Sequence, residues 1–312
     1  MSDLKVFRLG ADGREVELRG STVALEVELQ RRVEAGMERM LGIRFLASEY
    51  PTGPWHRGRV DSLGLDENGV PVVVEFKKGS DSGVVPQALS YLTWLKSSRH
   101  EFEALVREKL GEAAVESVDW RSPRALCVAA GYSWHDRVTV GELGRRWPIE
   151  LVRYRVFDGG LLSLQLVEPV VAPTSAPARR QTSAPAAVAA EVVEAAVVPT
   201  SVEVPECLRE LYGELDEVLT ASGEVETVQL KHYVAYRRLR NVASVVFRPS
   251  PQHRAMLVYL PLDPDTVELE EGFTRDMRGI GHLGTGDLEV RIASPADLAK
   301  AAVLIERTVQ EV

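Results

Sequence analysis

The chain has 312 residues, of which 45% are hydrophobic, so it is long enough for two domains that each bury a core. Its formal net charge of −9 argues against a protein that coats nucleic acid by bulk attraction, although a local basic groove is compatible with it. Its two cysteines lie far apart, which gives no disulfide framework or cysteine-based zinc site and fits a reducing cytoplasm. We see no apolar run long enough to span a membrane and no signal peptide, so we expect a cytoplasmic protein.

The first half of the chain predicts a mixed α/β domain, with a core order of helix, three strands, helix and strand. Hydrophobic periodicity and turn residues predict, in chain order, two strands, a helix ended by Gly42, three strands, two helices, a strand, a helix and two strands, at residues 5–9, 14–18, 24–41, 43–50, 59–65, 70–76, 82–96, 99–118, 124–130, 139–146, 149–156 and 161–167.

The hairpin in the middle of this domain brings two acidic side chains together. A three-residue loop that ends at Gly69, in the left-handed conformation, is a common hairpin turn. Counting back along both strands from this loop places Asp61 opposite Glu75, with Cβ atoms about 4.5–5.5 Å apart. Because side chains alternate along a strand, Lys77 lies on the same face as Glu75.

Opposed carboxylates destabilise a sheet, and the valines around Glu75 imply burial, which raises the cost further. A divalent cation relieves this repulsion, and two carboxylates with open water positions are typical of Mg²⁺ that works on a phosphate. Such an ion polarises the scissile phosphate and lowers the pKa of a bound water, while Lys77 positions or activates that water. The spacing alone fits equally well a solvent-facing hairpin with a salt bridge from Asp61 or Glu75 to Lys77.

The same residues resemble the PD-(D/E)xK nuclease superfamily. The run GRVDSLGLDENGVPVVVEFKKG, followed by Gln87-Ala-Leu-Ser-Tyr91, is similar to the RecB-like nuclease domain of the NucS (EndoMS) type, and the resemblance covers about residues 20–130. It implies a restriction-endonuclease-like mixed sheet flanked by helices. It also implies a Mg²⁺- or Mn²⁺-dependent DNA endonuclease that hydrolyses phosphodiester bonds, with Asp61 and Glu75 as the metal ligands. The family leads us to consider DNA repair or defence against foreign DNA, and a homodimer.

The family also places a glutamate on the helix before the hairpin. The segment Glu26-Val-Glu28-Leu-Gln30 resembles its E-x-x-L-Q stretch, which makes Glu26 the best match for a catalytic residue. Glu28 and Glu34 lie on the same predicted helix and could serve instead, and each of the three could also be a solvated helix charge.

Four more residues complete the expected site. Gln87 matches the family glutamine that helps to hold the site, and Tyr91, one helical turn further, either packs or contacts nucleic acid. Arg59 and Lys78 are candidates for phosphate contacts or for solvated edge charges.

The loop 51–57 and the start of the chain depart from the family pattern. This loop offers Trp55 and His56 to a substrate or covers the site. The first 20 or so residues do not resemble the DNA-binding domain of the mismatch endonucleases, so mismatch recognition does not transfer.

A change of composition divides the chain into three parts. Residues 1–168 form the nuclease-like domain, and the Ala/Pro/Val-rich segment 169–205 is interpreted as a flexible linker because its prolines prevent a long helix. Residues 206–312 read as a smaller α/β domain, which resembles a small domain of unknown function described only as transport-like. Its predicted elements are a helix, a helix or strand, two strands, a helix, a strand and a helix, at 206–220, 229–240, 244–247, 255–260, 273–277, 287–292 and 295–310.

Two runs in the second domain have both a binding and a structural interpretation. The run 231–240 mixes cations with aromatic residues, a combination that binds nucleic acid or forms a solvated basic face. The glycine-rich run 279–286 is either a phosphate cradle or a turn, and no Gly-Lys-Ser/Thr of a P-loop follows it.

Three functions therefore stay open at this point. The first is the metal-dependent endonuclease, with DNA as its partner. The second is a nuclease fold that has lost activity and only binds nucleic acid, and the third is a protein that binds a partner protein through its C-terminal domain.

Overall fold

The computed structural model describes residues 4–10, 14–80, 83–171, 199, 204–223 and 225–311. It divides the chain into two compact units, Met1–Thr174 and Ser175–Val312. The predicted linker 169–205 falls largely outside the described residues. Within the described ranges, no helix has the length and hydropathy needed to cross a membrane.

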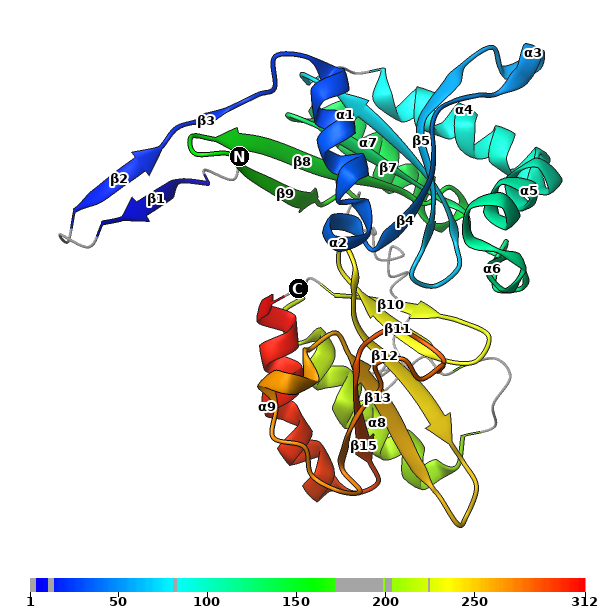
Figure 1. The fold of residues 1–312 in the computed structure, drawn as a ribbon, viewed down its shortest axis with the longest axis vertical. Helices are drawn as coiled ribbons and strands as arrows, with labels where there is room; N and C mark the ends of the chain where they lie inside the picture. The colour runs from blue at the N-terminus through cyan, green and yellow to red at the C-terminus, as the bar shows by residue number, and fades with distance from the viewer. Residues whose placement is uncertain are drawn as a thin grey trace, which may run out of the picture. The chain divides into compact units, whose positions relative to one another are not determined.

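The first unit is built on a seven-stranded mixed sheet with strand order β3-β8-β7-β6-β5-β4, and β9 pairs with β8 beside this path (Figure 1). Strands β4 to β6 are antiparallel neighbours, whereas β6, β7 and β8 run parallel. The strands are β3 (Gly20–Ser21), β4 (Ile43–Pro51), β5 (Arg59–Asp66), β6 (Pro71–Lys77), β7 (Arg124–Ala129), β8 (Ile149–Phe157) and β9 (Leu161–Val167).

Helices cover both faces of this sheet. In Figure 1, α1 lies in front of the sheet and α4 behind it. The helices are α1 (Glu26–Ala35), α2 (Met37–Leu41), α3 (Gly53–His56), α4 (Val84–Ser97), α5 (Arg99–Leu110), α6 (Glu112–Glu116) and α7 (Trp134–Leu143), followed by the short η1 (Gly144–Arg146). The order α1, β4, β5, β6, α4, β7 confirms the predicted α/β core of a restriction-endonuclease-like mixed sheet flanked by helices.

The alternation of side chains along β5 and β6 separates the two faces. Leu63 and Val73 pack with α4 residues such as Ala88 and Leu92 in one buried cluster. The intervening Ser62 faces α1, because its hydroxyl donates to the carboxylate of Glu34 at 2.6 Å. Glu75, two residues after Val73 on β6, therefore points to the α4 side.

Two long predicted helices are each divided by a glycine. The predicted helix 24–41 is α1 and α2, separated at Gly36, whose φ of −129° and ψ of 21° are not helical. The predicted helix 99–118 is α5 and α6, separated at Gly111, whose φ is +88°. In both places a residue without Cβ adopts a conformation outside the helical region at little cost.

The predicted helix 139–146 begins earlier than its apolar pattern suggests. Helix α7 starts after Ser133, whose hydroxyl accepts from the Asp136 amide at 3.1 Å, while the Asp136 carboxylate accepts from the Ser133 amide at 2.8 Å. This reciprocal cap satisfies free N–H groups of the first turn and sets the start of the helix.

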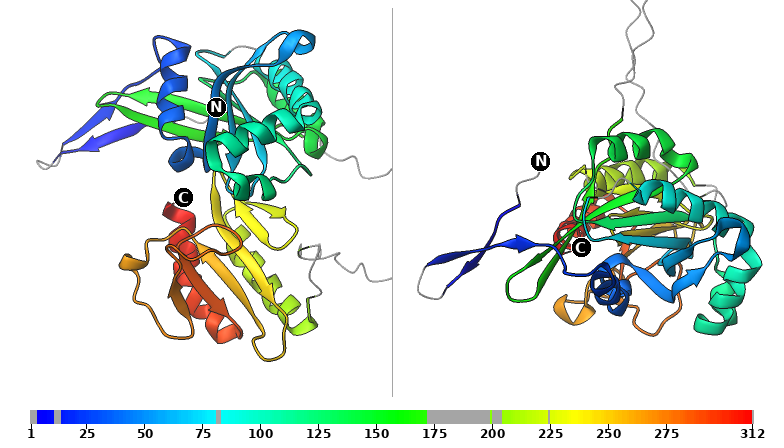
Figure 2. Two further views of the ribbon diagram at one scale, coloured as in Figure 1. Left: turned by 45° about the vertical axis from the view of Figure 1, so that its right-hand side comes forward. Right: turned by 90° about the horizontal axis from the view of Figure 1, so that it is seen from above.

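A separate two-stranded sheet of β1 (Val6–Leu9) and β2 (Glu15–Leu18) precedes β3. Figure 2 shows it as an arm that extends beyond the seven-stranded sheet. Phe7, Leu9 and Val16 are exposed on it.

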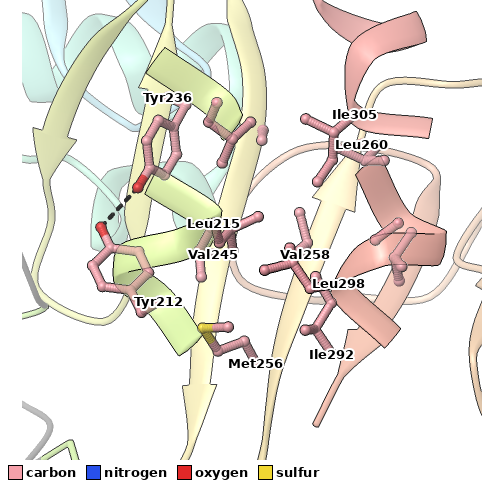
Figure 3. Close-up of a cluster of buried hydrophobic side chains, with 14 of the residues drawn as sticks. Tyr212, Leu215, Tyr236, Val245, Met256, Val258, Leu260, Ile292, Leu298 and Ile305 are labelled. Atoms are coloured by element: carbon pink, nitrogen blue, oxygen red, sulfur yellow. Dashed lines mark hydrogen bonds between the residues drawn. The ribbon is translucent and has the colours of Figure 1, made fainter. Parts of the chain in front are cut away.

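The second unit is a six-stranded antiparallel sheet, of order β10-β11-β12-β13-β15-β14, with two helices. Its elements are α8 (Glu206–Thr220), β10 (Glu226–Gln229), β11 (Val234–Arg237), β12 (Asn241–Arg248), β13 (Ala255–Leu260), the short η2 (Pro264–Thr266), β14 (Thr274–Asp276), β15 (Leu288–Ile292) and α9 (Pro295–Glu311). Side chains of α8 and α9 share one buried cluster with the sheet (Figure 3). Within it the Tyr236 hydroxyl donates to that of Tyr212 at 2.9 Å. The predicted helix 273–277 is wrong, because this segment is β14, an edge strand paired with β15.

Both runs of uncertain role in this unit serve its packing. The glycine-rich run lies against the sheet: a Cβ at Gly284 would sit 2.4 Å from the Ser244 Cβ, and one at Gly286 2.6 Å from the Leu260 carbonyl carbon. In the run 231–240, Arg237 is nearly buried and pairs with Glu226 at 2.8 Å. These contacts favour the structural interpretation of both runs.

Candidate active site

The predicted hairpin register is confirmed. The Asp66 amide donates to the Val70 carbonyl at 2.9 Å, and Gly69 has a φ of +76°. The strand pairing runs from Leu65 opposite Pro71 to Ser62 opposite Val74, and residues 61 and 75 come directly after its last pair.

At this step each carboxylate accepts a hydrogen bond from the other strand. The Asp61 amide donates to Glu75 Oε1 at 3.2 Å, and the Phe76 amide donates to Asp61 Oδ2 at 2.8 Å. Two acidic side chains of adjacent strands are thereby held side by side by backbone donors.

Glu75 is an unusual residue because it is fully buried and incompletely satisfied. Its exposed fraction is 0%, and its Oε2 has no hydrogen-bond partner among the described residues. Burial, and then the nearby charge of Asp61, raise the pKa of Glu75 to about 9. Burial also raises the pKa of Asp61, against the opposing effects of the Phe76 amide and of Lys77. The pair thus resists carrying two negative charges until a cation is supplied.

Lys77 follows Glu75 by two residues on β6, so both side chains start from the same side of the sheet. Only 17% of the lysine side chain is exposed. Its Nζ is 3.6 Å from Glu26 Oε1, and the Lys78 amide donates to Glu26 Oε2 at 2.8 Å. Lys77 and Glu26 both act on the charge state of Asp61, since the lysine lowers the pKa of that carboxyl and the glutamate raises it. The ammonium group of Lys77 therefore has a carboxylate on each side.

Of the three helix glutamates, Glu26 is the one that the structure brings to the end of β6. Glu28 pairs with Arg32 at 2.7 Å on the exposed side of α1. Glu34 accepts from the Ser62 hydroxyl at 2.6 Å, so it lies on the α1 side of the hairpin.

Gln30 belongs to this site, although the sequence pattern assigns it no role. Its side-chain nitrogen lies 2.8 Å from the Asp61 carbonyl oxygen, 3.0 Å from Ser48 Oγ and 3.0 Å from Glu34 Oε1, and only 4% of the residue is exposed. It ties α1 to the backbone of the strand that carries Asp61. The available signals are its place in the E-x-x-L-Q stretch and its position four residues after Glu26, which places both on one helix face.

Gln87 and Tyr91 lie on α4 beneath the start of β5. The Gln87 amide nitrogen lies 3.4 Å from the Tyr91 hydroxyl, and the described contacts of Gln87 include neither Asp61 nor Glu75. Tyr91 is only 6% exposed and packs on Gly58, where a Cβ would lie 2.5 Å from the Tyr91 hydroxyl oxygen. This contact explains why a glycine three residues before the aspartate accompanies a tyrosine on the next helix, and it matches the packing role left open for Tyr91.

The two predicted phosphate-binding cations are accessible. Arg59 is 69% exposed and lies 3.2 Å from Glu49 Oε2, and Lys78 is exposed at the end of β6. Both flank the carboxylate pair, one on each strand.

The site offers few protein ligands to an ion. Among the described residues, no group of three or more His, Cys, Asp and Glu side chains is arranged to hold a metal. Asp61 and Glu75 are the two carboxylates that lie together, and the unpaired Glu75 Oε2 is the kind of buried oxygen that a hard cation satisfies. An ion with mostly water and substrate oxygens as ligands fits this donor set.

Comparisons with known proteins identify no family. No family model matches the chain. An uncharacterized protein of Haemophilus influenzae is 23% identical over 316 residues, which cover 99% of this chain and 100% of that protein. The relative therefore spans both units.

Two solved structures are similar over 48% of this chain. One is a repair endonuclease from Pyrococcus abyssi, with 20% identity, a TM-score of 0.26 and 50% of that chain covered. The other is EndoMS in a complex with double-stranded DNA, with 16% identity, a TM-score of 0.25 and 65% of that chain covered. This chain thus matches about half to two thirds of their length, and TM-scores of this size add nothing to the fold assignment, which rests on the element order and strand pairing above.

Proposed function

We propose that the first unit is a metal-dependent DNA endonuclease that hydrolyses phosphodiester bonds. The observation that carries the proposal is the pair of half-buried Asp61 and fully buried Glu75 beside Lys77, with one Glu75 oxygen left without a partner among the described residues. Such a pair does not stabilise the hairpin, because two adjacent carboxylates destabilise a sheet at neutral pH.

The residues of the chain divide the work as follows. Asp61 and Glu75 would hold Mg²⁺ or Mn²⁺, which when bound polarises the scissile phosphate and stabilises the charge that develops on it. Lys77 orients the attacking water through its ammonium group or, as the neutral amine, accepts the proton of that water. Arg59 and Lys78 bind flanking phosphates, whereas Glu26 keeps the ammonium of Lys77 in place.

The proposal is tested by incubating plasmid and single-stranded DNA with the protein and Mg²⁺ or Mn²⁺, with and without EDTA. We expect cleavage that EDTA abolishes. In Asp61→Asn the rate should fall by at least about 100-fold, because loss of a residue that merely supports a metal ligand already costs 10–100-fold. The exposed Asp158 provides a matched control, and Asp158→Asn should cleave like the wild type.

Metal binding has its own readout in thermal melts with and without Mn²⁺. The wild type should be stabilised by the ion, and Asp61→Asn should not. DNA binding without cleavage under any of these conditions would favour the inactive nucleic-acid-binding module instead.

A further inference from the structure

The loop between β4 and β5 carries the most exposed large apolar side chain that the structure describes. Trp55, on α3, has an exposed fraction of 90%. Figure 1 shows α3 beyond the end of the sheet, on a ribbon that leaves β4 and returns to β5. Tryptophan is highly buried on average, so an indole that is almost entirely exposed to solvent is unusual and is accessible to a binding partner.

The base of this loop is rigid. The Thr52 amide donates to the Gly58 carbonyl at 2.9 Å, and the Gly58 amide donates to Thr52 Oγ1 at 3.0 Å, so the loop is closed by a bracket of hydrogen bonds. Beneath the bracket, the buried Tyr91 packs on Gly58. Arg57, at the end of α3, has a φ of +51°, a conformation that a residue with a side chain rarely adopts. The indole of Trp55 thus lies at the tip of a loop whose base is held by hydrogen bonds and packing.

The tip is basic and adjoins the candidate site. The segment 51–59, PTGPWHRGR, contains Arg57 and Arg59 and no carboxylate, and Arg59 also lies 3.2 Å from Glu49 Oε2. Arg59 lies two residues before Asp61 on β5, about 6.5–7 Å along the strand. An aromatic ring among cations, next to a site that would hold a phosphate, is the combination that binds single-stranded nucleic acid.

We propose that Trp55 stacks on an unpaired nucleobase of the DNA substrate while Arg57 and Arg59 hold the adjoining phosphates. The inference rests on the proposed endonuclease activity and names its substrate class, DNA with single-stranded or unstacked nucleotides beside the scissile phosphate. In an intact duplex both faces of an interior base are covered by its neighbours, so the indole finds no surface there. A single strand, a flap or a junction offers bases that are free to turn outward.

The test is an equilibrium binding titration in EDTA, where no cleavage occurs, with a labelled single-stranded oligonucleotide and the duplex of the same sequence. Stacking on one base predicts that Trp55→Leu binds the single strand about 5- to 150-fold more weakly, while its binding of the duplex is unchanged. Trp55→Phe should keep most of the affinity because it retains an aromatic face. In addition, the single strand should quench the tryptophan fluorescence of the wild type more than that of Trp55→Phe.

Trp134, which is 63% exposed on α7, supplies the matched control. Trp134→Leu should bind the single strand like the wild type, and an equal loss in the two leucine variants would overturn the proposal. Unchanged binding in Trp55→Leu, with a wild type that cleaves DNA, would overturn the stacking role and leave the endonuclease intact. A wild type that neither binds nor cleaves either DNA would instead remove the proposed function, and the stacking role with it.

Discussion

The acidic side chains at the two ends of one hairpin differ in their partners. At the loop end, Asp66 is 2% exposed and its Oδ2 lies 3.0 Å from Arg124 Nε, while the Asn68 and Val70 amides donate to its Oδ1, each at 2.9 Å. Arg124 also reaches Glu150 at 3.1 Å. At the open end, Asp61 and Glu75 lie side by side, and no guanidinium is among the contacts of either in the described part of the chain.

Because of this difference, we assign a structural role to Asp66 and a ligand-binding role to Asp61 and Glu75. A buried carboxylate with an arginine and backbone donors is satisfied within the chain. The other pair has backbone donors for one oxygen of each group, and Glu75 Oε2 has no partner in the part of the chain that is described. Four changes test the contrast, in order of decreasing expected effect.

Lys77→Ala should reduce the cleavage rate by about 10²–10⁴-fold, the usual contribution of a group that transfers a proton in the transition state. DNA and metal binding should persist, because an ammonium group is not a metal ligand. Lys77→Arg should not restore the rate, since a guanidinium cannot act as a base. Cleavage time courses beside binding isotherms measure both quantities, and the exposed neighbour provides the control Lys78→Ala. Equal losses at both lysines would place the catalytic centre elsewhere.

Arg124→Met should destabilise the first unit by about 3–5 kcal/mol, because it leaves Asp66 buried without its counter-charge. Urea unfolding monitored by circular dichroism gives this free energy. The double variant with Asp66→Asn should recover part of the loss. A cost below about 1 kcal/mol, well under the usual cost of breaking a buried pair, would mean that water replaces the arginine and that the two ends of the hairpin differ less than their contacts indicate.

Glu75→Gln should stabilise the metal-free protein at alkaline pH. The pKa of Glu75 is raised to about 9 in the folded state, so between its usual value and 9 the folded protein holds a proton that the unfolded chain releases. Stability therefore falls as pH rises through this window, by at most about 1.4 kcal/mol per pH unit.

Between pH 5 and pH 8 the wild type should lose about 1–4 kcal/mol more than Glu75→Gln, as measured by melts in EDTA. Addition of Mn²⁺ at pH 8 should raise the melting temperature of the wild type alone. The prediction fails if the two proteins show the same pH dependence.

Gly58→Ala should cost about 1–3 kcal/mol, because the new Cβ would lie 2.5 Å from the Tyr91 hydroxyl oxygen and 2.8 Å from its ring. Gly79 follows the other strand of the site, and a Cβ placed on it would have no described atom within 4 Å, so Gly79→Ala should be nearly neutral. Thermal melts of both variants test whether position 58 requires glycine because a larger side chain would clash with Tyr91.

Much of the first unit is predictable from the sequence because its information is local. The loop ending at Gly69 sets the register of the hairpin, and alternation along β6 then places Glu75 and Lys77 on one face. Contacts across elements are not encoded in this local way. The Gly58–Tyr91 packing joins β5 to α4, and the choice of Glu26 over the other helix glutamates depends on where α1 crosses the end of β6.

The wrong predictions come from short signals outweighed by a longer pattern. The apolar periodicity of residues 24–41 conceals the break at Gly36, and the apolar residues after position 138 draw the predicted helix start away from the Ser133–Asp136 cap. The segment at 273–277 is an edge strand because β15 offers it hydrogen bonds, which no local propensity reveals.

The hairpin loop has a consequence for how this chain can vary in length. Gly69 is held in place by its surroundings: the Asp119 amide donates to its carbonyl at 2.7 Å, and a Cβ there would lie 2.2 Å from the Ser117 carbonyl oxygen. Insertion or deletion of one residue between Asp66 and Val70 would shift one strand by a single step, which turns its side chains to the other face of the sheet. Glu75 would then point toward α1 and would no longer lie beside Asp61. An insertion or deletion of one residue at the far end of the hairpin would thus destroy the carboxylate pair, as a substitution of either residue would.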